Sequence, residues 1–264
     1  MHAVRRDIAD IALAEWIFAP HYARADHQTL ASLSAMLLTR PSHSAEASSQ
    51  LLHGEGFAVL DISGGWAWGY CAHDHYVGYL PTEALKPRQD TSHVVSAREA
   101  PIFDAPSIKA PVVGTLTLGA RLAGAIDNDF VGSETGFVHR RHVAPLPADP
   151  VAIAKRLIDS PYLWGGRGAG GIDCSGLIQL AHELAGIRCP RDSDQQREGL
   201  GRLLDDSAPL MRGDLVFFPG HVGLMVDEGR MIHANAFWMA VTIEPLADVM
   251  ARSDHPVLAR RRLA

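Results

Sequence analysis

Cys174 has the setting in this 264-residue chain that best supports nucleophilic chemistry. It follows Asp173, and apolar residues then recur at three- and four-residue steps from Leu177 to Ala185, which is typical of one helix face. Asp173 suits the N-cap, so Cys174 lies in the first helical turn. Free backbone amides and the helix dipole there favour a thiolate and can stabilise an oxyanion. The pattern predicts a reactive thiol, whereas a cysteine outside such a setting is more often buried and inert.

A thiolate nucleophile needs a base at hydrogen-bond distance and a group that orients that base. Two neighbouring predicted strands carry His221 and His233. If the loop between the strands is 227–229, with Gly229 in the left-handed position, His221 faces Asn235 and His233 lies diagonally across on the same face. A two- or four-residue loop would put the histidines on opposite faces. The favoured three-residue loop therefore predicts a line of Cys, His and His.

Two other chemistries use the same residue types. Cys174, His221 and His233 are all zinc-ligand types, but no fourth ligand follows at a regular spacing, so the thiolate interpretation is preferred and no metal or other cofactor is expected. The glycine-rich stretch 165–171 lacks the Lys-Ser/Thr of a phosphate-binding loop. Cys71 and Cys189 lack a helix-start setting and are interpreted as inert thiols.

The C-terminal part of the chain must position these groups. A helix is predicted over 151–158, then a glycine-rich turn, the helix after Cys174, and strands that include 214–218 and 221–226. That order predicts an α+β domain. Prolines at 145, 147 and 150 mark a linker before it.

The N-terminal part of the chain has a different pattern of apolar residues. Residues 5–18 and 26–38 carry a helical period. From 50 to 85, short apolar runs alternate with glycine turns, and the stretch 93–146 repeats the plan. A weak repeat of about 55 residues predicts two small β-barrels.

Five motifs together resemble those of the NlpC/P60 cysteine peptidases, and both barrels resemble bacterial SH3 domains. The motifs are Tyr-Leu-Trp-Gly-Gly (162–166), Asp-Cys-Ser-Gly-Leu (173–177), Arg-Gly-Asp-Leu-Val-Phe-Phe (212–218), Gly-His-Val-Gly-Leu-Met (220–225) and His-Ala-Asn (233–235). More narrowly, the chain looks like the γ-D-glutamyl-L-diamino acid endopeptidases, which cleave cell-wall stem peptides. The resemblance implies an α+β papain-like NlpC/P60 catalytic domain preceded by two small all-β SH3-like barrels.

The domain boundaries expected on this basis are a helical extension over 1–44, a first SH3-like domain over 45–88 and a second over 89–147. The NlpC/P60 cysteine peptidase domain then covers 148–264.

The resemblance also implies roles for single residues. Cys174 would be the nucleophile, His221 the base and His233 the residue that orients the base. The oxyanion and substrate-binding residues implied are Tyr162, Asp173, Ser175, Asp192, Ser193 and Tyr76. Among these, Asp192 and Ser193 would contact the L-Ala and D-Glu of the peptide.

One position departs from the family pattern. The family often has a carboxylate for the substrate amine where this chain has Ser48. Either Glu46, two residues away, replaces it, or amine recognition depends on Asp192 alone. A strict preference for a free N-terminal L-Ala is therefore an open question at this stage.

The expected activity is that of a cysteine endopeptidase that hydrolyses the γ-D-glutamyl–diamino acid bond of L-Ala-γ-D-Glu-diamino acid peptides during muropeptide recycling. The alternatives are an exported or wall-associated peptidoglycan hydrolase or amidase of the same fold, an amide-forming or lipid acyl transferase, and a non-catalytic protein that binds wall peptides.

Composition limits the partners. With 24 Lys and Arg against 30 Asp and Glu, the net charge of −6 gives no electrostatic case for nucleic acid. The sequence contains no run of about 18 apolar residues, so it predicts no membrane span. Three cysteines and early acids, including Asp7, favour a cytoplasmic protein. The run 260–262, three arginines, is interpreted as a solvated terminus.

Overall fold

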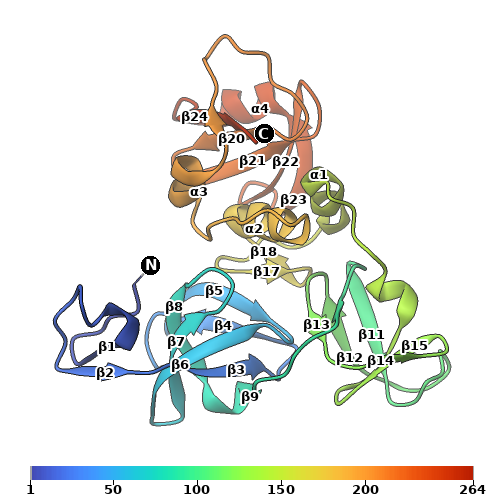
Figure 1. Ribbon diagram of the computed structural model, residues 1–264. Helices are drawn as coiled ribbons and strands as arrows, with labels where there is room; N and C mark the ends of the chain where they lie inside the picture. Colours follow the sequence, from blue (N-terminus) through green and yellow to red (C-terminus); the bar gives the residue numbers. More distant parts are fainter. Residues whose placement is uncertain (1, 264) are drawn as a thin grey trace. The chain divides into compact units, whose positions relative to one another are not determined.

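The computed structural model describes residues 2–263. Its chain divides into two compact units, the first ending at Ala144 and the second beginning at Pro145 (Figure 1). Each unit has hydrophobic core clusters of its own. No helix in residues 2–263 is both long and apolar enough to cross a bilayer.

A seven-stranded antiparallel sheet forms the first half of unit 1, in the order β5-β4-β8-β7-β6-β3-β9. The strands are β3 (Asp26–Leu30), β4 (Ser34–Leu38), β5 (Ala47–Leu52), β6 (Gly56–Ser63), β7 (Trp66–Cys71), β8 (Val77–Pro81) and β9 (Leu85–Pro87), with a 3₁₀ turn η2 (Thr82–Ala84) before β9. Gly64 and Gly65, both at positive φ, make the two-residue turn between β6 and β7. Leu30, Phe57 and Leu80 are fully buried in the core of this sheet.

A second, five-stranded antiparallel sheet follows in the order β12-β11-β16-β15-β14. Its strands are β11 (Glu99–Phe103), β12 (Val112–Thr117), β14 (Ala125–Asp127), β15 (Phe130–Ser133) and β16 (Gly136–His139), beside a short pair of β10 (His93–Val94) with β13 (Arg121–Leu122) and a 3₁₀ turn η3 (Arg140–Val143). Ile102, Leu116 and Val138 are buried in a separate core. The prediction of short strands joined by turns in both repeats is confirmed, whereas their closure into two barrels stays a prediction.

The helices predicted over 5–18 and 26–38 are wrong. The first stretch holds β1 (Ile8–Asp10), which pairs in parallel with β2 (His21–Ala23), and a 3₁₀ turn η1 (Ile11–Leu13). The second stretch holds β3 and β4, which lie in the seven-stranded sheet, so the helical extension expected over 1–44 is not present. Partners distant in sequence decide this outcome, because β3 pairs with β6 and β9 and buries Leu30 in the core of the sheet.

Unit 2 has a six-stranded antiparallel sheet, ordered β19-β24-β20-β21-β22-β23. Its elements are α1 (Pro150–Ala154), η4 (Lys155–Leu157), β17 (Arg167–Gly168), β18 (Gly171–Ile172), α2 (Cys174–Leu184), α3 (Ser193–Gly199), β19 (Arg202–Leu203), β20 (Leu215–Phe218), β21 (His221–Met225), β22 (Arg230–Asn235), β23 (Ala240–Pro245), α4 (Leu246–Arg252) and β24 (Ala259–Arg262). Helix α2 packs against β21 and β22. The helix predicted after Cys174 is confirmed, as is its end near Gly186, which has φ of +84°.

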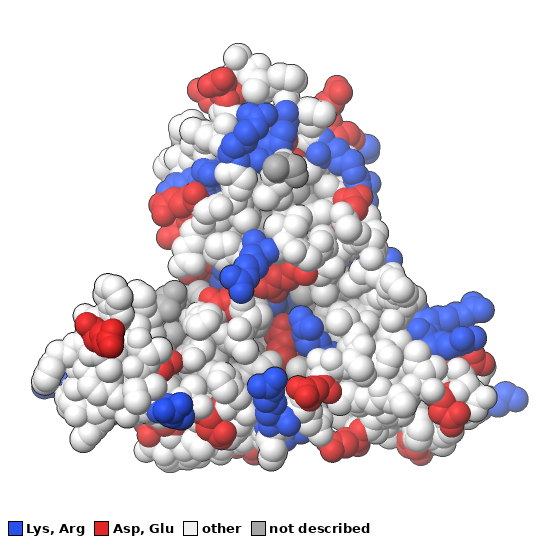
Figure 2. All heavy atoms as spheres, in the orientation of Figure 1, with Lys and Arg blue, Asp and Glu red and all other residues white. Residues whose placement is uncertain are grey.

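The arginine run 260–262 is not a solvated terminus. It forms most of β24, which pairs with β20 inside the sheet. The Arg262 guanidinium donates two hydrogen bonds of 2.7 Å to the buried carboxylate of Asp214. Backbone pairing and this ion pair order a segment that composition alone assigned to solvent. Elsewhere, basic and acidic side chains are interspersed with wide uncharged areas on the face shown in Figure 2.

Candidate active site

Cys174 is the first residue of α2, and its side chain is 6% exposed. The predicted N-cap is confirmed, because the Asp173 carboxylate accepts a 2.6 Å hydrogen bond from the Gly176 amide. The thiol sulfur lies 4.0 Å from the Gly220 carbonyl oxygen and also accepts a hydrogen bond from the backbone amide of Val222. The sulfur therefore lies against the main chain on both sides of His221.

His221 and His233 face each other, as the hairpin argument predicts. The observed partners Leu224–Ile232 and Met225–Met231 give the three-residue loop 227–229. The left-handed conformation expected at Gly229 is wrong, because its φ is not positive. His221 Nε2 and His233 Nδ1 are 2.8 Å apart. Both side chains are thus on one face of the sheet, at the end that meets the start of α2.

A carboxylate that the sequence analysis missed completes this line. His233 Nε2 is 2.7 Å from Oε1 of Glu244, and Arg252 donates two hydrogen bonds of 2.6 Å to the two oxygens of the same carboxylate. The signal that points to Glu244 in the sequence is the register of the next hairpin, β22–β23. In that hairpin His233 pairs with Thr242, which places Glu244 diagonally across on the same face.

Burial controls the charge of the reacting groups. It raises the pKa of Cys174 to about 11, with a further contribution from the charge of Asp173. It lowers the pKa of His221 to about 3, and His233 adds to that effect. The expectation that the helix start favours the thiolate is therefore outweighed by desolvation of the thiol. Both groups are therefore neutral at pH 7.

Tyr162 is half-buried beside this pair. Its backbone amide donates a 2.9 Å hydrogen bond to the Met239 carbonyl, which ties the 161–166 segment to the β22–β23 loop. Burial, followed by the charge of Cys174, raises the pKa of Tyr162 to about 12. The hydroxyl therefore stays protonated and can donate to a developing oxyanion.

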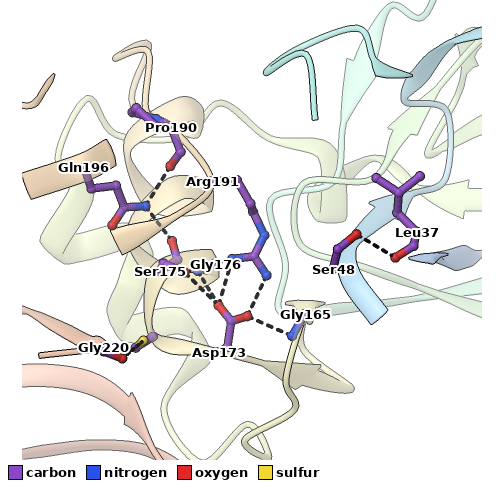
Figure 3. A network of polar contacts seen from close by, with 11 residues as sticks. Leu37, Ser48, Gly165, Asp173, Ser175, Gly176, Pro190, Arg191, Gln196 and Gly220 are labelled. Carbon is purple, nitrogen blue, oxygen red and sulfur yellow. Dashed lines mark hydrogen bonds and ion pairs between the residues drawn. The ribbon is translucent and has the colours of Figure 1, made fainter. Parts of the chain in front are cut away.

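A buried polar network holds the start of α2 (Figure 3). Arg191 is 2% exposed and donates to both oxygens of Asp173 at 3.0 and 2.6 Å, and also to the Ser175 hydroxyl at 2.9 Å. The second Asp173 oxygen accepts from the Gly165 amide at 2.8 Å. Asp173 and Ser175 thus have internal partners that hold Cys174 and the glycine turn in place. Arg191 was missed because no local spacing singles it out.

Helix α3 carries the predicted substrate strip. Gln196 donates 2.9 and 2.7 Å hydrogen bonds to the carbonyls of Ser175 and Pro190 (Figure 3), so α3 is tied to the start of α2. Asp192 and Ser193 lie at the start of α3, and both are half-buried.

Three further residues named in the sequence analysis belong to unit 1. Tyr76 packs against the core of the seven-stranded sheet. The Ser48 hydroxyl donates a 3.1 Å hydrogen bond to the Leu37 carbonyl (Figure 3), and Glu46 is exposed.

Within residues 2–263, no three side chains of His, Cys, Asp or Glu are grouped so that they could hold a metal ion.

Comparison with protein families gives two matches. Residues 159–258 match the NlpC/P60 family, and residues 37–85 match the bacterial dipeptidyl-peptidase Sh3 domain. The chain is similar to a solved NlpC/P60 family protein from Bacillus cereus, with a TM-score of 0.75 at 21% identity, over 89% of this chain and 99% of that one. That likeness shows a shared fold.

Similar curated proteins are peptidases by name. Dipeptidyl-peptidase 6 of Lysinibacillus sphaericus is 28% identical over 88% of this chain and 94% of its own length. A gamma-D-glutamyl-L-lysine dipeptidyl-peptidase of Bacillus cereus is 34% identical over 42% of this chain, and the match spans 35% of that relative. The chain therefore carries an NlpC/P60 peptidase domain, preceded by an SH3 domain of the bacterial dipeptidyl-peptidase type.

Proposed function

We propose that the protein is a cysteine peptidase that hydrolyses the γ-D-glutamyl–diamino acid bond of peptidoglycan stem peptides. One observation carries the proposal: the Cys174 sulfur lies against the backbone of residues 220 and 222, while His221 is hydrogen-bonded to His233. A thiol, a base and an orienting group in one line are the arrangement that acyl transfer requires.

The mechanism follows from these positions. The Cys174 thiol gives its proton to His221, and the sulfur attacks the carbonyl carbon of the scissile amide. The Cys174 amide and the Tyr162 hydroxyl donate to the oxyanion. His221 then protonates the leaving amine, and the C–N bond breaks to leave a thioester. Water, deprotonated by His221, attacks the thioester, and the thiol is released with its proton restored.

The substrate class is supported by relatives and by the site. Two similar proteins are named gamma-D-glutamyl-L-lysine dipeptidyl-peptidases. Asp192 supplies a carboxylate for the free amine of L-Ala, and Ser193 a hydroxyl for D-Glu.

The same proposal includes a papain-like layout for unit 2 and SH3-like barrels for both sheets of unit 1. It also includes a cytoplasmic role in recycling wall fragments, which three free cysteines favour.

Removal of the thiol tests the proposal. We expect Cys174→Ala to lose hydrolysis of L-Ala-γ-D-Glu-diaminopimelate by a factor of about 10³ or more, because no other group can form the acyl-enzyme. Cys71→Ala, which removes a buried thiol from unit 1, is the matched control and should keep its activity. Peptide products are measured by mass spectrometry. Undiminished hydrolysis by Cys174→Ala would refute the assignment.

A substrate pair tests the recognition of the amine. The peptide with a free N-terminal L-Ala should be cleaved faster than its N-acetyl form, because acetylation removes the cation that would pair with Asp192. Asp192→Asn should reduce this preference, whereas Glu46→Gln should leave it unchanged. Equal cleavage of both forms, or cleavage of intact wall, would instead favour the wall hydrolase alternative.

A further inference from the structure

We propose that Glu244 is a positioning residue that fixes which ring nitrogens of His233 and His221 carry protons, and thereby leaves His221 Nδ1 free to accept the Cys174 proton. The kinetic consequence rests on the proposed peptidase function, whereas the assignment of protons rests on geometry alone.

An ionised carboxylate can only accept hydrogen bonds. Glu244 Oε1 is 2.7 Å from His233 Nε2, so that nitrogen must carry the proton and donate it. Burial lowers the pKa of His233, and its neutral ring then has a bare Nδ1, which can only accept. Its partner at 2.8 Å is His221 Nε2, which must therefore be the donor. The remaining nitrogen of His221, Nδ1, is left as the base.

The surroundings of Glu244 keep it ionised. Its side chain is 11% exposed, and both oxygens accept hydrogen bonds from Arg252. The Thr242 hydroxyl donates to Oε1 at 3.2 Å. Burial alone would raise the pKa of Glu244, but hydrogen bonds from Arg252, Trp238 and His233 outweigh burial and lower the pKa to about 2. The carboxylate is therefore an acceptor throughout the neutral range.

Along the line from Glu244 through His233 to His221, each donor fixes the role of the next ring nitrogen. A change at Glu244 therefore alters the protonation of His221, which it does not contact directly. An amide at position 244 offers N–H groups where the carboxylate offers only lone pairs. When such an N–H faces His233, Nε2 of that ring must accept and Nδ1 must carry the proton. His221 Nε2 then becomes the acceptor, its proton moves to Nδ1, and the base is lost. A serine-protease triad with the corresponding Asp-to-Asn change loses about 10⁴ in kcat for the same reason.

The experiment measures protonation directly. In the full-length protein with ¹⁵N-labelled histidine, long-range ¹H–¹⁵N spectra should show His233 and His221 both protonated at Nε2. His233→Ala and His221→Ala variants assign the signals. In Glu244→Gln we expect a mixture that includes the Nδ1-protonated forms. A wild-type spectrum with Nδ1 protonated on either ring would overturn the proposal.

Kinetics give the second readout. Glu244→Gln should lower kcat by about 10²-fold or more with KM changed less than about 3-fold, because substrate contacts are untouched. Glu244→Asp keeps the carboxylate and should retain the wild-type tautomers and recover part of kcat. Glu228→Gln makes the same charge change at an exposed loop position of the same sheet and should leave both readouts unchanged.

The two proposals fail in different ways. If the tautomers are as expected but the wild-type protein cleaves no stem peptide, the proposed function fails and the positioning role stands. If the wild-type protein cleaves the peptide and Glu244→Gln keeps its tautomers, the positioning role is refuted whatever happens to kcat.

Discussion

The buried carboxylates of the site, Asp173 and Glu244, are each paired with an arginine. Arg191 faces Asp173, Arg252 faces Glu244, and neutral Cys174 lies beside neutral His221. Because a lone buried charge is costly, the thiolate and the imidazolium are best formed together, by transfer of one proton between them. The proposed reacting pair is thus uncharged at rest, whereas the ion pairs that support it are charged.

Glu244 should make the stability of unit 2 depend on acid. Its pKa is about 2 in the folded protein against an ordinary 4.5, so it contributes stability above pH 4.5 that is lost as the pH falls toward 2. We expect this contribution to be about 1–3 kcal/mol. Urea unfolding measured between pH 5.5 and 2.5 checks it. The fall in unfolding free energy should be smaller in Glu244→Gln than in the wild type, and equal slopes would contradict the assignment.

At the scale of elements, glycines let α2 approach the 163–172 segment. A Cβ on Gly176 would meet the Gly166 carbonyl oxygen, and a Cβ on Gly166 would meet the Gly171 carbonyl oxygen. A backbone carbonyl cannot move out of the way of an added Cβ as the end of a flexible side chain can. The proposed nucleophile, Cys174, therefore starts a helix that can come this close to the Tyr162 segment only because Gly166 and Gly176 have no side chain.

Gly176→Ala should accordingly separate these elements. We expect a loss of about 1–3 kcal/mol in unfolding free energy and a lower kcat, because Cys174 moves relative to Tyr162. Gly170→Ala is the matched control, since Gly170 lies in the 163–172 segment that α2 approaches and its Cβ would meet no atom within 4 Å. Denaturant unfolding and peptide cleavage are measured on both. Comparable effects of the two substitutions would argue against the close-approach explanation.

Local pattern predicted the site better than it predicted the sheets. The His221–His233 register depends on a loop of three residues, and the start of α2 depends on Asp173, so short windows suffice for both. The strands at 26–38 and 260–262 form through partners far along the chain, such as β6 for β3 and β20 for β24. Arg191 likewise meets Asp173 only after folding. No window of sequence contains those pairs.

At the scale of the whole molecule, two units with separate cores predict separable unfolding. Arg191→Met removes one partner of a buried ion pair in unit 2, which should cost that unit about 3 kcal/mol. Calorimetry should then show one transition shifted to lower temperature while the transition of unit 1 stays in place. A single transition that moves as a whole would mean that the two units unfold together.

The hydrogen bond between Trp238 and Glu244 has a practical consequence. Indole emission is sensitive to charges and proton donors in direct contact with the ring, and this indole, half exposed in the β22–β23 loop, touches the carboxylate that ends the histidine line. The protein thus contains its own optical probe. With the other four tryptophans replaced by phenylalanine, the fluorescence of Trp238 would report on Glu244 in real time, without any attached dye.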